Sequence, residues 1–295
     1  MKAYITLVST DDFVIGAITL FLSLKAVKAK YPFYVLLSPT VSLQKEQELK
    51  NCSDINVIRY KKSHIDDYTT YGSNGNHRWN NTFDKLAIFS LTHFSKLVFL
   101  DCDTYVIRNI DELFDLEHMS AVYIYNTYQN PYKDTKFCSG LLVIEPNENE
   151  YLELREQFFY TAHKHAISGV PFGDQNVLND YYNKWDSDKS KHLYDEYNSM
   201  WGTMEKLLAS KWTLTDKKGR TQIKVIHFSG LHKPWMNKTL FLIKTVIRSF
   251  RHYRKIPNFQ ALKVLLNYFN LVRKAKRLPV ITKRGDGSSV SQSYH

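Results

Sequence analysis

The stretch Leu97-Val98-Phe99-Leu100-Asp101-Cys102-Asp103 decides the fold and locates the first candidate site. Its short apolar run is typical of a strand that is buried on both faces of a sheet. Asp101 and Asp103 are therefore expected just past the carboxyl end of that strand, where open α/β sheets bind their ligands. If the chain stays extended, both carboxylates point the same way and share one divalent cation, while Cys102 turns inward. The alternative is a turn that binds nothing, because such pairs of aspartates are common in loops.

Segments typical of strands and helices alternate along residues 1–237, which predicts an α/β domain with a mostly parallel central sheet flanked by helices. Strands are expected at 4–9, 33–37, 55–60, 97–100, 121–125, 141–144 and 224–227. Helices are expected at 13–30, 41–50, 82–94, 109–114, 151–165 and 174–182. Residues 61–82 are polar, and a loop of that length in a compact domain is usually functional or mobile.

Charge is distributed unevenly along the 295-residue chain, whose net charge is +11. Residues 1–216 hold 28 acidic and 22 basic residues, whereas residues 217–295 hold 18 basic residues and one acid, Asp286. A strongly basic segment indicates contact with an anionic surface, either a membrane or nucleic acid. Nucleic acid is the less favoured partner, because no recognised binding module accompanies the charge.

The basic segment 238–284 is expected to form two amphipathic helices on either side of Pro257. The apolar face of the first holds Leu240, Ile243, Val246, Ile247, Phe250 and Tyr253, and that of the second holds Phe259, Leu262, Leu265, Leu266, Phe269 and Val272. Two interpretations stay open: the helices pack on the preceding domain, or they lie on anionic lipid with their apolar faces inserted. Residues 285–295 are rich in Gly and Ser and are expected to be disordered.

The cysteines and the amino-terminal residues bear on the cellular compartment. Cys52, Cys102 and Cys138 show no paired or metal-like spacing, which argues against a secreted disulfide framework. Met1-Lys2 leads directly into the first expected strand, and no apolar run reaches the roughly 18–20 residues of a spanning helix. The expected location is the cytoplasm, with peripheral attachment to the cytosolic face of a membrane as a further option.

A second candidate site begins where the last expected strand ends. His227 is followed by a loop that contains Gly230, Lys233 and Pro234. Two carboxylates and one imidazole form a ligand set that fits Mn²⁺, whereas Mg²⁺ prefers oxygen ligands. His227 is therefore a candidate third ligand, and Lys233 is a candidate point charge for a diphosphate. A structural histidine and a solvated lysine are the alternatives.

Two further motifs place polar residues at the ends of expected elements. Asp174 and Gln175 begin a helix, where Asp is first of all a common cap, whereas Gln175 gains nothing from capping and is a candidate for an inward-facing polar role. Ser139-Gly140 precede a strand, and a glycine there lets the backbone approach a ligand or forms a plain turn.

Taken in order, five motifs resemble those of the retaining glycosyltransferases of the glycogenin and bacterial lipopolysaccharide galactosyltransferase family (glycosyltransferase family 8). They are Asp-x-Asp, Asn-Ile-Asp-Glu-Leu-Phe, Ser-Gly, Gly-Asp-Gln-x-x-Leu-Asn and His-Phe-x-Gly-x-x-Lys-Pro-Trp, and the similarity extends over residues 3–236. The resemblance implies a GT-A fold, a Rossmann-like domain at 1–237 that binds a nucleotide-sugar. It also implies a UDP-sugar donor, Mn²⁺ with Mg²⁺ as a substitute, and a glycan or glycolipid acceptor; a homodimer is a further option.

The resemblance also assigns roles by position. The implied metal ligands are Asp101, Asp103 and His227, and the implied catalytic residues are Lys85, Asp174 and Gln175. The implied nucleotide-sugar contacts are these six together with Leu7, Val8, Thr10, Asp12, Phe13, Cys102, Ser139, Gly140, Gly230 and Lys233, with Asp11 as an alternative to Asp12. Phe13 stands where the family often has a tyrosine stacked on uracil, and Cys138 stands where it usually has an asparagine.

The sequence therefore predicts a retaining transferase that moves a hexose, glucose or galactose, from a UDP-sugar to an external glycan, glycolipid or protein-linked acceptor. Tyr197-Asn198 matches a glycogenin motif, but residues 199–226 contain no tyrosine, so self-priming there is not expected. Two alternatives remain. One is an inactive membrane-associated scaffold, which only Cys138 supports. The other is a sugar-phosphate nucleotidyltransferase, which is expected to have a glycine-rich loop where Ser9-Thr10-Asp11-Asp12 has none.

Overall fold

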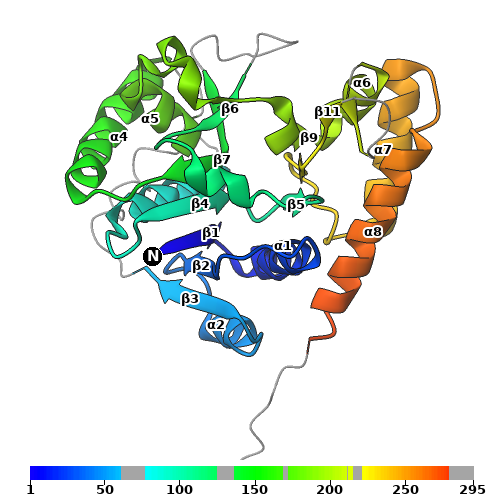
Figure 1. The fold of residues 1–295 in the computed structure, drawn as a ribbon, viewed down its shortest axis with the longest axis horizontal. Helices are drawn as coiled ribbons and strands as arrows, with labels where there is room; N and C mark the ends of the chain where they lie inside the picture. Colours follow the sequence, from blue (N-terminus) through cyan, green and yellow to red (C-terminus); the bar gives the residue numbers. More distant parts are fainter. Residues whose placement is uncertain (61–76, 125–135, 169–171, 211, 215–220, 279–295) are drawn as a thin grey trace, which may run out of the picture.

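The computed structural model describes residues 1–60, 77–124, 136–168, 172–210, 212–214 and 221–278 (Figure 1). Its central sheet has seven strands in the order β3-β2-β1-β4-β7-β6-β8. The strands are β1 (Lys2–Val8), β2 (Phe33–Leu37), β3 (Ile55–Arg59), β4 (Lys96–Leu100), β6 (Ala121–Tyr123), β7 (Phe137–Ile144) and β8 (His192–Leu193). Among these strands only β7 runs antiparallel to its neighbours, so the predicted mostly parallel sheet is confirmed.

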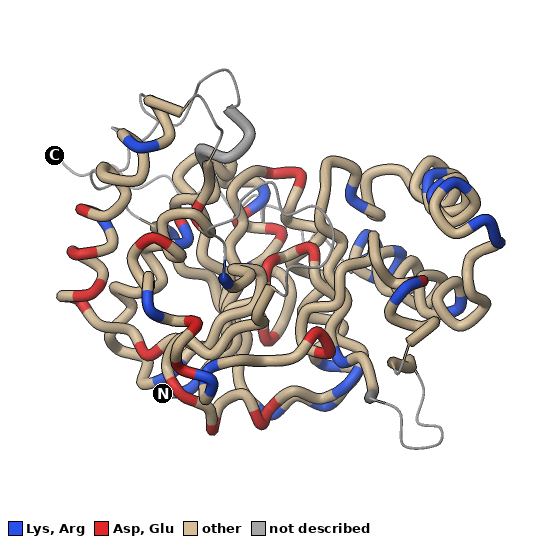
Figure 2. Tube along the Cα trace, turned by 90° about the horizontal axis from the view of Figure 1, so that it is seen from above, with Lys and Arg blue, Asp and Glu red and all other residues tan. Residues whose placement is uncertain are grey.

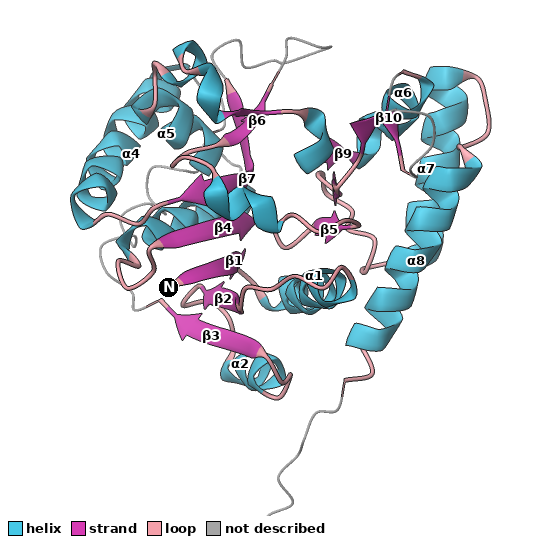
Figure 3. Ribbon diagram, viewed as in Figure 1, coloured by secondary structure: helices cyan, strands magenta, loops and turns pink. Residues whose placement is uncertain are grey.

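Helices cover both faces of the sheet (Figure 3). The α-helices are α1 (Val14–Ala26), α2 (Leu43–Lys50), α4 (Glu148–Ser168), α5 (Asp174–Tyr181), α6 (Met204–Ala209), α7 (Lys238–Tyr253) and α8 (Phe259–Ala275). Alternate residues of β1 point to opposite faces, so Tyr4 packs with α1 and α2, whereas Ile5 packs with α4 and α5. The sheet is thus buried on both sides, as its continuous apolar strands predict.

Several 3₁₀ helices connect these elements, and all of them except η3 are short. They are η1 (Asp11–Phe13), η3 (His77–Ser90), η4 (Asp111–Asp115), η5 (Trp185–Ser187), η6 (Lys189–Lys191), η7 (Asp195–Tyr197) and η8 (Trp201–Thr203). The helix predicted at 82–94 is therefore wrong in type and register, since it is a 3₁₀ helix that begins before residue 82 and ends at Ser90. The helix predicted to reach residue 30 ends at Ala26, where Val27 closes it with hydrogen bonds to Ser23 and Lys25.

A second, small sheet extends from the end of β4. It has the order β5-β12-β9, formed by β5 (Thr104–Val106), β12 (Val225–His227) and β9 (Ser199–Met200). β12 pairs antiparallel with β5, which places His227 opposite Thr104. β9 pairs parallel with the other edge of β12. A two-stranded pair, β10 (Trp212–Thr213) and β11 (Thr221–Gln222), completes the strands of the described residues.

The last helix, α8, packs against α1 (Figure 1). Its Leu265 and Tyr268 are fully buried in an apolar cluster that also contains Phe228 and Trp235. The apolar face predicted for this helix is partly wrong: Phe259 is 79% exposed, whereas Ala261, Tyr268 and Ala275 are buried. The buried side thus includes Ala261 and Ala275, whose small side chains allow α8 to approach the domain closely.

Two predictions from the sequence concern residues that are not described. The segment expected to be disordered, 285–295, lies outside the described residues, as does most of the loop at 61–82. Within the described residues, none of the helices combines the length and the apolar character needed to cross a bilayer.

Candidate active site

The chain turns directly after β4. The backbone N–H of Thr104 donates to the Asp101 carbonyl at 3.0 Å, and the Thr104 hydroxyl donates to the same oxygen at 2.8 Å. The chain therefore does not stay extended after Asp101. Cys102 is buried as predicted, and Asp101 and Asp103 lie at the carboxyl end of the strand on one side of the turn.

The turn brings both carboxylates to a histidine from a distant part of the chain. His227 Nε2 lies 3.1 Å from Asp103 Oδ1 and 3.8 Å from Asp101 Oδ2. One ligand atom from each of these three residues falls within 4.8 Å of the others. The pairing of β12 with β5 produces this proximity, because the N–H of Phe228 donates to the carbonyl of Asp103 at 2.9 Å.

The ring of His227 is held in an orientation that suits a metal ligand. Its Nδ1 lies 2.9 Å from Asn198 Oδ1, which can only accept, so Nδ1 donates to Asn198 and Nε2 faces the carboxylates. A Cβ placed on Gly140 would lie 2.6 Å from His227 Cε1, so the ring occupies space that only a glycine leaves open. This donor set, two carboxylates and one oriented imidazole, fits a Mn²⁺ ion.

Burial and charge act in opposition at this cluster. Burial lowers the pKa of His227, but Asp103 and Asp101 outweigh it and raise the pKa to about 10. Burial likewise opposes ionisation of Asp103, yet His227 and Lys233 hold its pKa well below the usual range. Burial raises the pKa of Asp101 despite the neighbouring Lys85. The carboxylates therefore stabilise positive charge at this point, and a bound cation would have to displace the proton on His227 Nε2.

A second charged group adjoins the first. Lys85, from η3, lies 2.6 Å from Asp174 Oδ2 and 3.1 Å from Asp101 Oδ1. Ser139 donates its hydroxyl to Asp174 Oδ2 at 2.7 Å, and its N–H donates to Gln175 Oε1 at 3.1 Å. Burial lowers the pKa of Lys85, but the two aspartates hold it well above its usual range. Lys85, Asp174 and Gln175, which have a predicted catalytic role, therefore lie together. They adjoin the cluster formed by Asp101, Asp103 and His227.

The loop after β12 returns to the same cluster. Lys233 is buried and donates to Asp103 Oδ2 and, at 3.2 Å, to the Phe228 carbonyl. Gly230 has a φ of +110°, a conformation that L side chains rarely adopt. The bend at Gly230 turns the chain back so that Lys233 reaches the carboxylates.

The residues expected to bind the nucleoside lie at the end of β1. Leu7 and Val8 are buried, and Thr10 and Asp12 follow them at the surface. The ring of Phe13 lies edge-on to Trp235, with centroids 5.9 Å apart. The alternative residue Asp11 is engaged elsewhere, because its Oδ1 accepts the Ser42 N–H at 2.8 Å next to α2.

Comparison with known proteins gives the family. A sequence model of the family described as "Glycosyl transferase family 8" matches residues 4–239. Glycogenin-1 of Mus musculus is 32% identical over 235 residues, which cover 79% of this chain and 65% of that protein. This chain belongs to glycosyltransferase family 8. Glycogenin-2 of Homo sapiens is also 32% identical, over 240 residues that cover 80% of this chain and 44% of that protein.

The solved structures agree with the fold of this family 8 member. The galactosyltransferase LgtC, determined with donor and acceptor sugar analogs, superposes with a TM-score of 0.64 at 17% identity. The match covers 95% of this chain and 98% of that one. The GT-A fold and the family predicted from the sequence are confirmed. The chain spans 65% and 44% of the lengths of the two glycogenins.

Two residues of this family 8 member that the sequence did not single out support the site. Asn198 orients His227, and the Thr82 hydroxyl accepts the backbone N–H of Asp174 at 3.3 Å. The only signal for Asn198 was its place in a motif shared with glycogenins, and nothing in the spacing of the chain pairs it with a residue 29 positions later. The β9–β12 pairing creates that contact.

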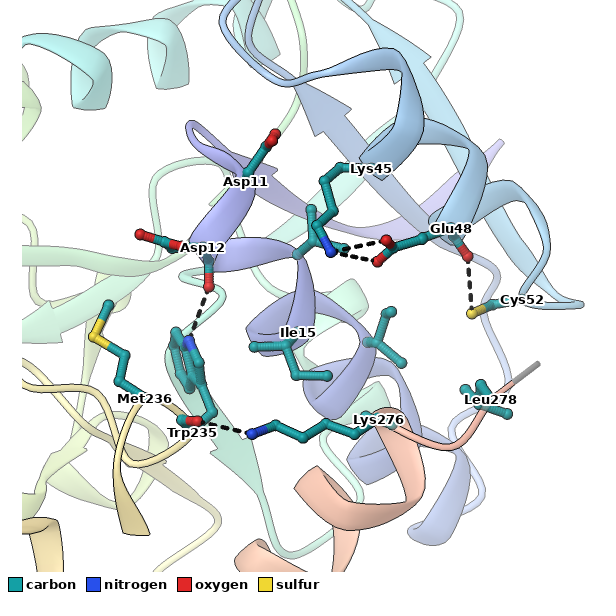
Figure 4. A pocket seen from close by; sticks show the side chains of 13 residues that line it. Asp11, Asp12, Ile15, Lys45, Glu48, Cys52, Trp235, Met236, Lys276 and Leu278 are labelled. Carbon is teal, nitrogen blue, oxygen red and sulfur yellow. Dashed lines mark hydrogen bonds and ion pairs between the residues drawn. The ribbon is translucent and has the colours of Figure 1, made fainter. Parts of the chain in front are cut away.

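A cavity of about 450 Å³ lies behind the η1 turn, on the side of α1 that faces α2 and the end of α8 (Figure 4). Trp235 forms part of its wall and donates its indole N–H to the Asp12 carbonyl at 2.9 Å. Lys276, directly after α8, donates to the Trp235 carbonyl at 3.3 Å. These bonds tie the loop after β12 to both the η1 turn and α8.

Proposed function

We propose that this protein is a retaining hexosyltransferase that uses a UDP-sugar and a divalent cation, Mn²⁺ in preference to Mg²⁺. The observation that carries the proposal is the convergence of Asp101, Asp103 and His227 within 4.8 Å, with Nδ1 of His227 held by Asn198 and Nε2 turned toward the carboxylates. Mn²⁺ accepts this mixed oxygen and nitrogen coordination, whereas Mg²⁺ demands oxygen ligands in near-ideal octahedral geometry.

The chemistry requires stabilisation of a leaving group. Breaking a sugar–phosphate bond leaves extra negative charge on the departing diphosphate, and a bound Mn²⁺ neutralises part of that charge. Lys233 lies at the same cluster and supplies a second positive charge. It now donates to Asp103, so a diphosphate that binds here competes for an ammonium group that is already in place.

The reacting sugar needs a polar surface that does not move. Asp174 Oδ2 accepts from Lys85 and Ser139, and Gln175 Oε1 accepts from the Ser139 backbone. We propose that these fixed side chains face the anomeric carbon, where positive charge develops in the transition state. Retention of configuration by front-face attack and by a covalent intermediate on Asp174 are both compatible with this arrangement.

Glucose and galactose remain the two proposed hexoses, and an external glycan, glycolipid or protein-linked molecule remains the proposed acceptor. Residues 199–226, where the glycogenin-like tyrosine would be expected, contain none. Tyr197, just before that range, is 9% exposed, and its hydroxyl donates to Glu112. That tyrosine is therefore a poor acceptor, which favours a separate molecule.

The two alternative functions receive less support. A nucleotidyltransferase is expected to wrap a glycine-rich loop around phosphates after the first strand, but β1 is followed by the 3₁₀ turn Asp11–Phe13. An inactive scaffold would be expected to have lost ligands, yet the set of two aspartates and His227 is complete. Cys138, which replaces a usual asparagine, is the remaining argument for a scaffold.

The proposal is tested by titration calorimetry of UDP with and without Mn²⁺. We expect micromolar binding that requires the metal, and loss of that binding in Asp103→Asn. The amide is preferred to alanine, because Asp103 is buried against Lys233 and His227 and an amide keeps the size of its side chain. Asp115→Asn, an exposed aspartate at the end of η4, is the control.

The donor is then identified by incubating the protein with a panel of UDP-sugars and measuring released UDP. Release from UDP-glucose or UDP-galactose, abolished by Asp103→Asn, supports a hexosyltransferase. Metal-dependent UDP binding without release from any donor or added acceptor would favour the scaffold, and metal-independent binding would overturn the proposed ligand set.

A further inference from the structure

Helix α7 presents its apolar face to solvent. Leu240, Ile243, Val246, Ile247 and Phe250 share that face at helical spacing, and between 39% and 61% of each is exposed. A surface helix of a globular protein normally turns such a face toward the core. The orientation of α7 is therefore the reverse of the one that its sequence pattern predicts for a packed helix.

The opposite side of α7 accounts for its attachment to the protein. Thr245 accepts the indole N–H of Trp201 at 3.3 Å, and Phe241 packs on Phe228 with ring centroids 5.8 Å apart. The buried Ser249 donates to the Lys255 carbonyl at 3.0 Å and fixes the turn that leads to α8. The helix is thus held by specific polar and aromatic contacts, and the exposed apolar face is a consequence of them.

Basic residues border the exposed face. Lys244, Arg251, Arg254 and Lys255 are all exposed, and residues 217–285 contain no aspartate or glutamate. A shallow groove of about 560 Å³ lies on this face, lined by apolar side chains of α7 and by the basic residues Arg251, Arg254 and Lys255. Figure 2 shows that Lys and Arg predominate at the end of the molecule that carries α7, whereas Asp and Glu gather on the rest.

The apolar face of α7 and the basic residues beside it together indicate which kind of partner binds there. If two copies of the chain met through this face, their lysine and arginine side chains would come together, and the repulsion between these charges opposes self-association. The phosphates of a nucleic acid would pair with the lysine and arginine side chains, but the aliphatic side chains would stay in water. An anionic lipid surface satisfies both, because its headgroups pair with the bases while its acyl chains receive the apolar side chains.

We propose that α7 is an interfacial helix that docks this protein on an anionic membrane surface. Leu240, Ile243, Ile247 and Phe250 enter the acyl boundary, and Lys244 and Arg251 contact the lipid phosphates. The exposed Ile256, in the turn between α7 and α8, lines the same groove and extends the apolar surface. Figure 1 shows that α7 and α8 lie on the side toward which the carboxyl ends of β1 and β4 point, so docking places the candidate active site in the half of the molecule nearer the membrane.

The test is sedimentation of the full-length protein with vesicles of neutral phosphatidylcholine, alone or mixed with anionic phosphatidylglycerol. We expect binding to the mixed vesicles that weakens strongly between 0.1 and 0.5 M salt. Lys244→Glu combined with Arg251→Glu removes two bases and is expected to reduce affinity at least about 25-fold, at roughly fivefold for each basic residue. Phe250→Asp is expected to reduce binding at least about tenfold.

Matched controls separate docking from general charge or hydrophobicity. Ile167→Asp, at an exposed position of α4, and the pair Lys30→Glu and Lys189→Glu should leave vesicle binding unchanged. Circular dichroism and thermal melting establish that each variant is folded. Equal binding by the α7 variants and the controls would overturn the proposal. So would a concentration-dependent dimer that Phe250→Asp dissociates, or binding to nucleic acid in preference to anionic vesicles.

Discussion

The ammonium group of Lys85 lies 2.6 Å from the carboxylate of Asp174 and 3.1 Å from that of Asp101. One buried cation thus joins the carboxylate proposed to face the sugar to a carboxylate proposed to hold the metal. A change at either carboxylate alters the charge that Lys85 experiences, so the two halves of the site are electrostatically coupled. The effects of substitutions at Asp101 and Asp174 are therefore expected to be non-additive.

Asp174→Asn should impair catalysis more than donor binding. The amide keeps the shape of the side chain but removes the negative charge that stabilises the reacting sugar, and loss of one such contact costs roughly 10²–10³ in rate. Steady-state kinetics of UDP release should show the loss in kcat with the donor KM changed by less than about fivefold. Asp180→Asn, on the same helix but bonded to Lys164, is the control. An unchanged kcat in Asp174→Asn would remove this residue from the proposed mechanism.

Asn198→Leu should weaken metal binding without removing a ligand. The substitution deletes the acceptor that keeps the proton on His227 Nδ1, and groups that orient a ligand typically contribute 10- to 100-fold in metal affinity. Calorimetric titration of Mn²⁺ in the presence of UDP measures the effect. Tyr197→Phe changes the adjacent side chain, which contacts Glu112 and Lys224, and should leave the affinity unaltered. Equal Mn²⁺ affinities in Asn198→Leu and the unaltered protein would contradict the orienting role.

Gly140→Ala should displace His227. The added methyl group would lie 2.6 Å from Cε1 and 2.8 Å from Nδ1 of the imidazole, which is closer than real Cβ atoms approach other groups. We expect metal-dependent UDP binding to fall at least about tenfold, because the ring must move away from the carboxylates. Gly202→Ala serves as a comparison, since its methyl group meets the end of the flexible Arg248 side chain. Retention of full affinity by Gly140→Ala would show that the ring does not need this space.

Glu46 is expected to contribute to stability in a pH-dependent way. Its carboxylate lies 2.6 Å from Lys50 Nζ and 2.6 Å from Arg59 Nε, and these partners lower its pKa from 4.5 although burial opposes them. Because the folded pKa is the lower one, the stabilisation is fully present above pH 4.5 and is lost as the pH falls through the folded value.

Glu46→Gln should therefore reduce the free energy of unfolding by about 1 kcal/mol at pH 7. Urea denaturation at pH 7 and again near pH 3 should show that the difference from the unaltered protein shrinks at the lower pH. Glu156→Gln, an exposed glutamate of α4, should show no such pH-dependent difference. A constant difference for Glu46→Gln at both pH values would indicate that packing rather than charge is responsible.

The sequence predicted the parallel core of the sheet, because its strands are continuous apolar runs that end in polar turns. β4 is an example, in which Leu97 to Leu100 are fully buried. The antiparallel β7 was predicted only from Leu141 onward, and Ser139 and Gly140 lie within this strand rather than before it. Local patterns did not predict the turn after β4, because it depends on hydrogen bonds between Thr104 and Asp101. The same holds for η3, a 3₁₀ segment whose apolar spacing also suits an α-helix.

The candidate site was predicted as a set of residues but not as an arrangement. Motif order indicated that Asp101, Asp103 and His227 belong together, and the pairing of β5 with β12 explains how they meet. The contact of Asn198 with His227 depends on the register of a two-residue strand, which no periodicity reveals. The orientation of α7 was equally hidden, because an amphipathic pattern gives the faces of a helix but not which of them meets the protein.

The packing of α8 has a consequence for synthesis of the protein. Leu265 and Tyr268 complete the apolar cluster that supports Phe228 and Trp235, on either side of the loop that carries Lys233. A nascent chain on the ribosome must therefore emerge as far as α8 before that loop has its full support. Translation that stops before Leu265 would release a polypeptide with the candidate ligands but without the wall behind them, a target for chaperones and proteases rather than a shorter enzyme.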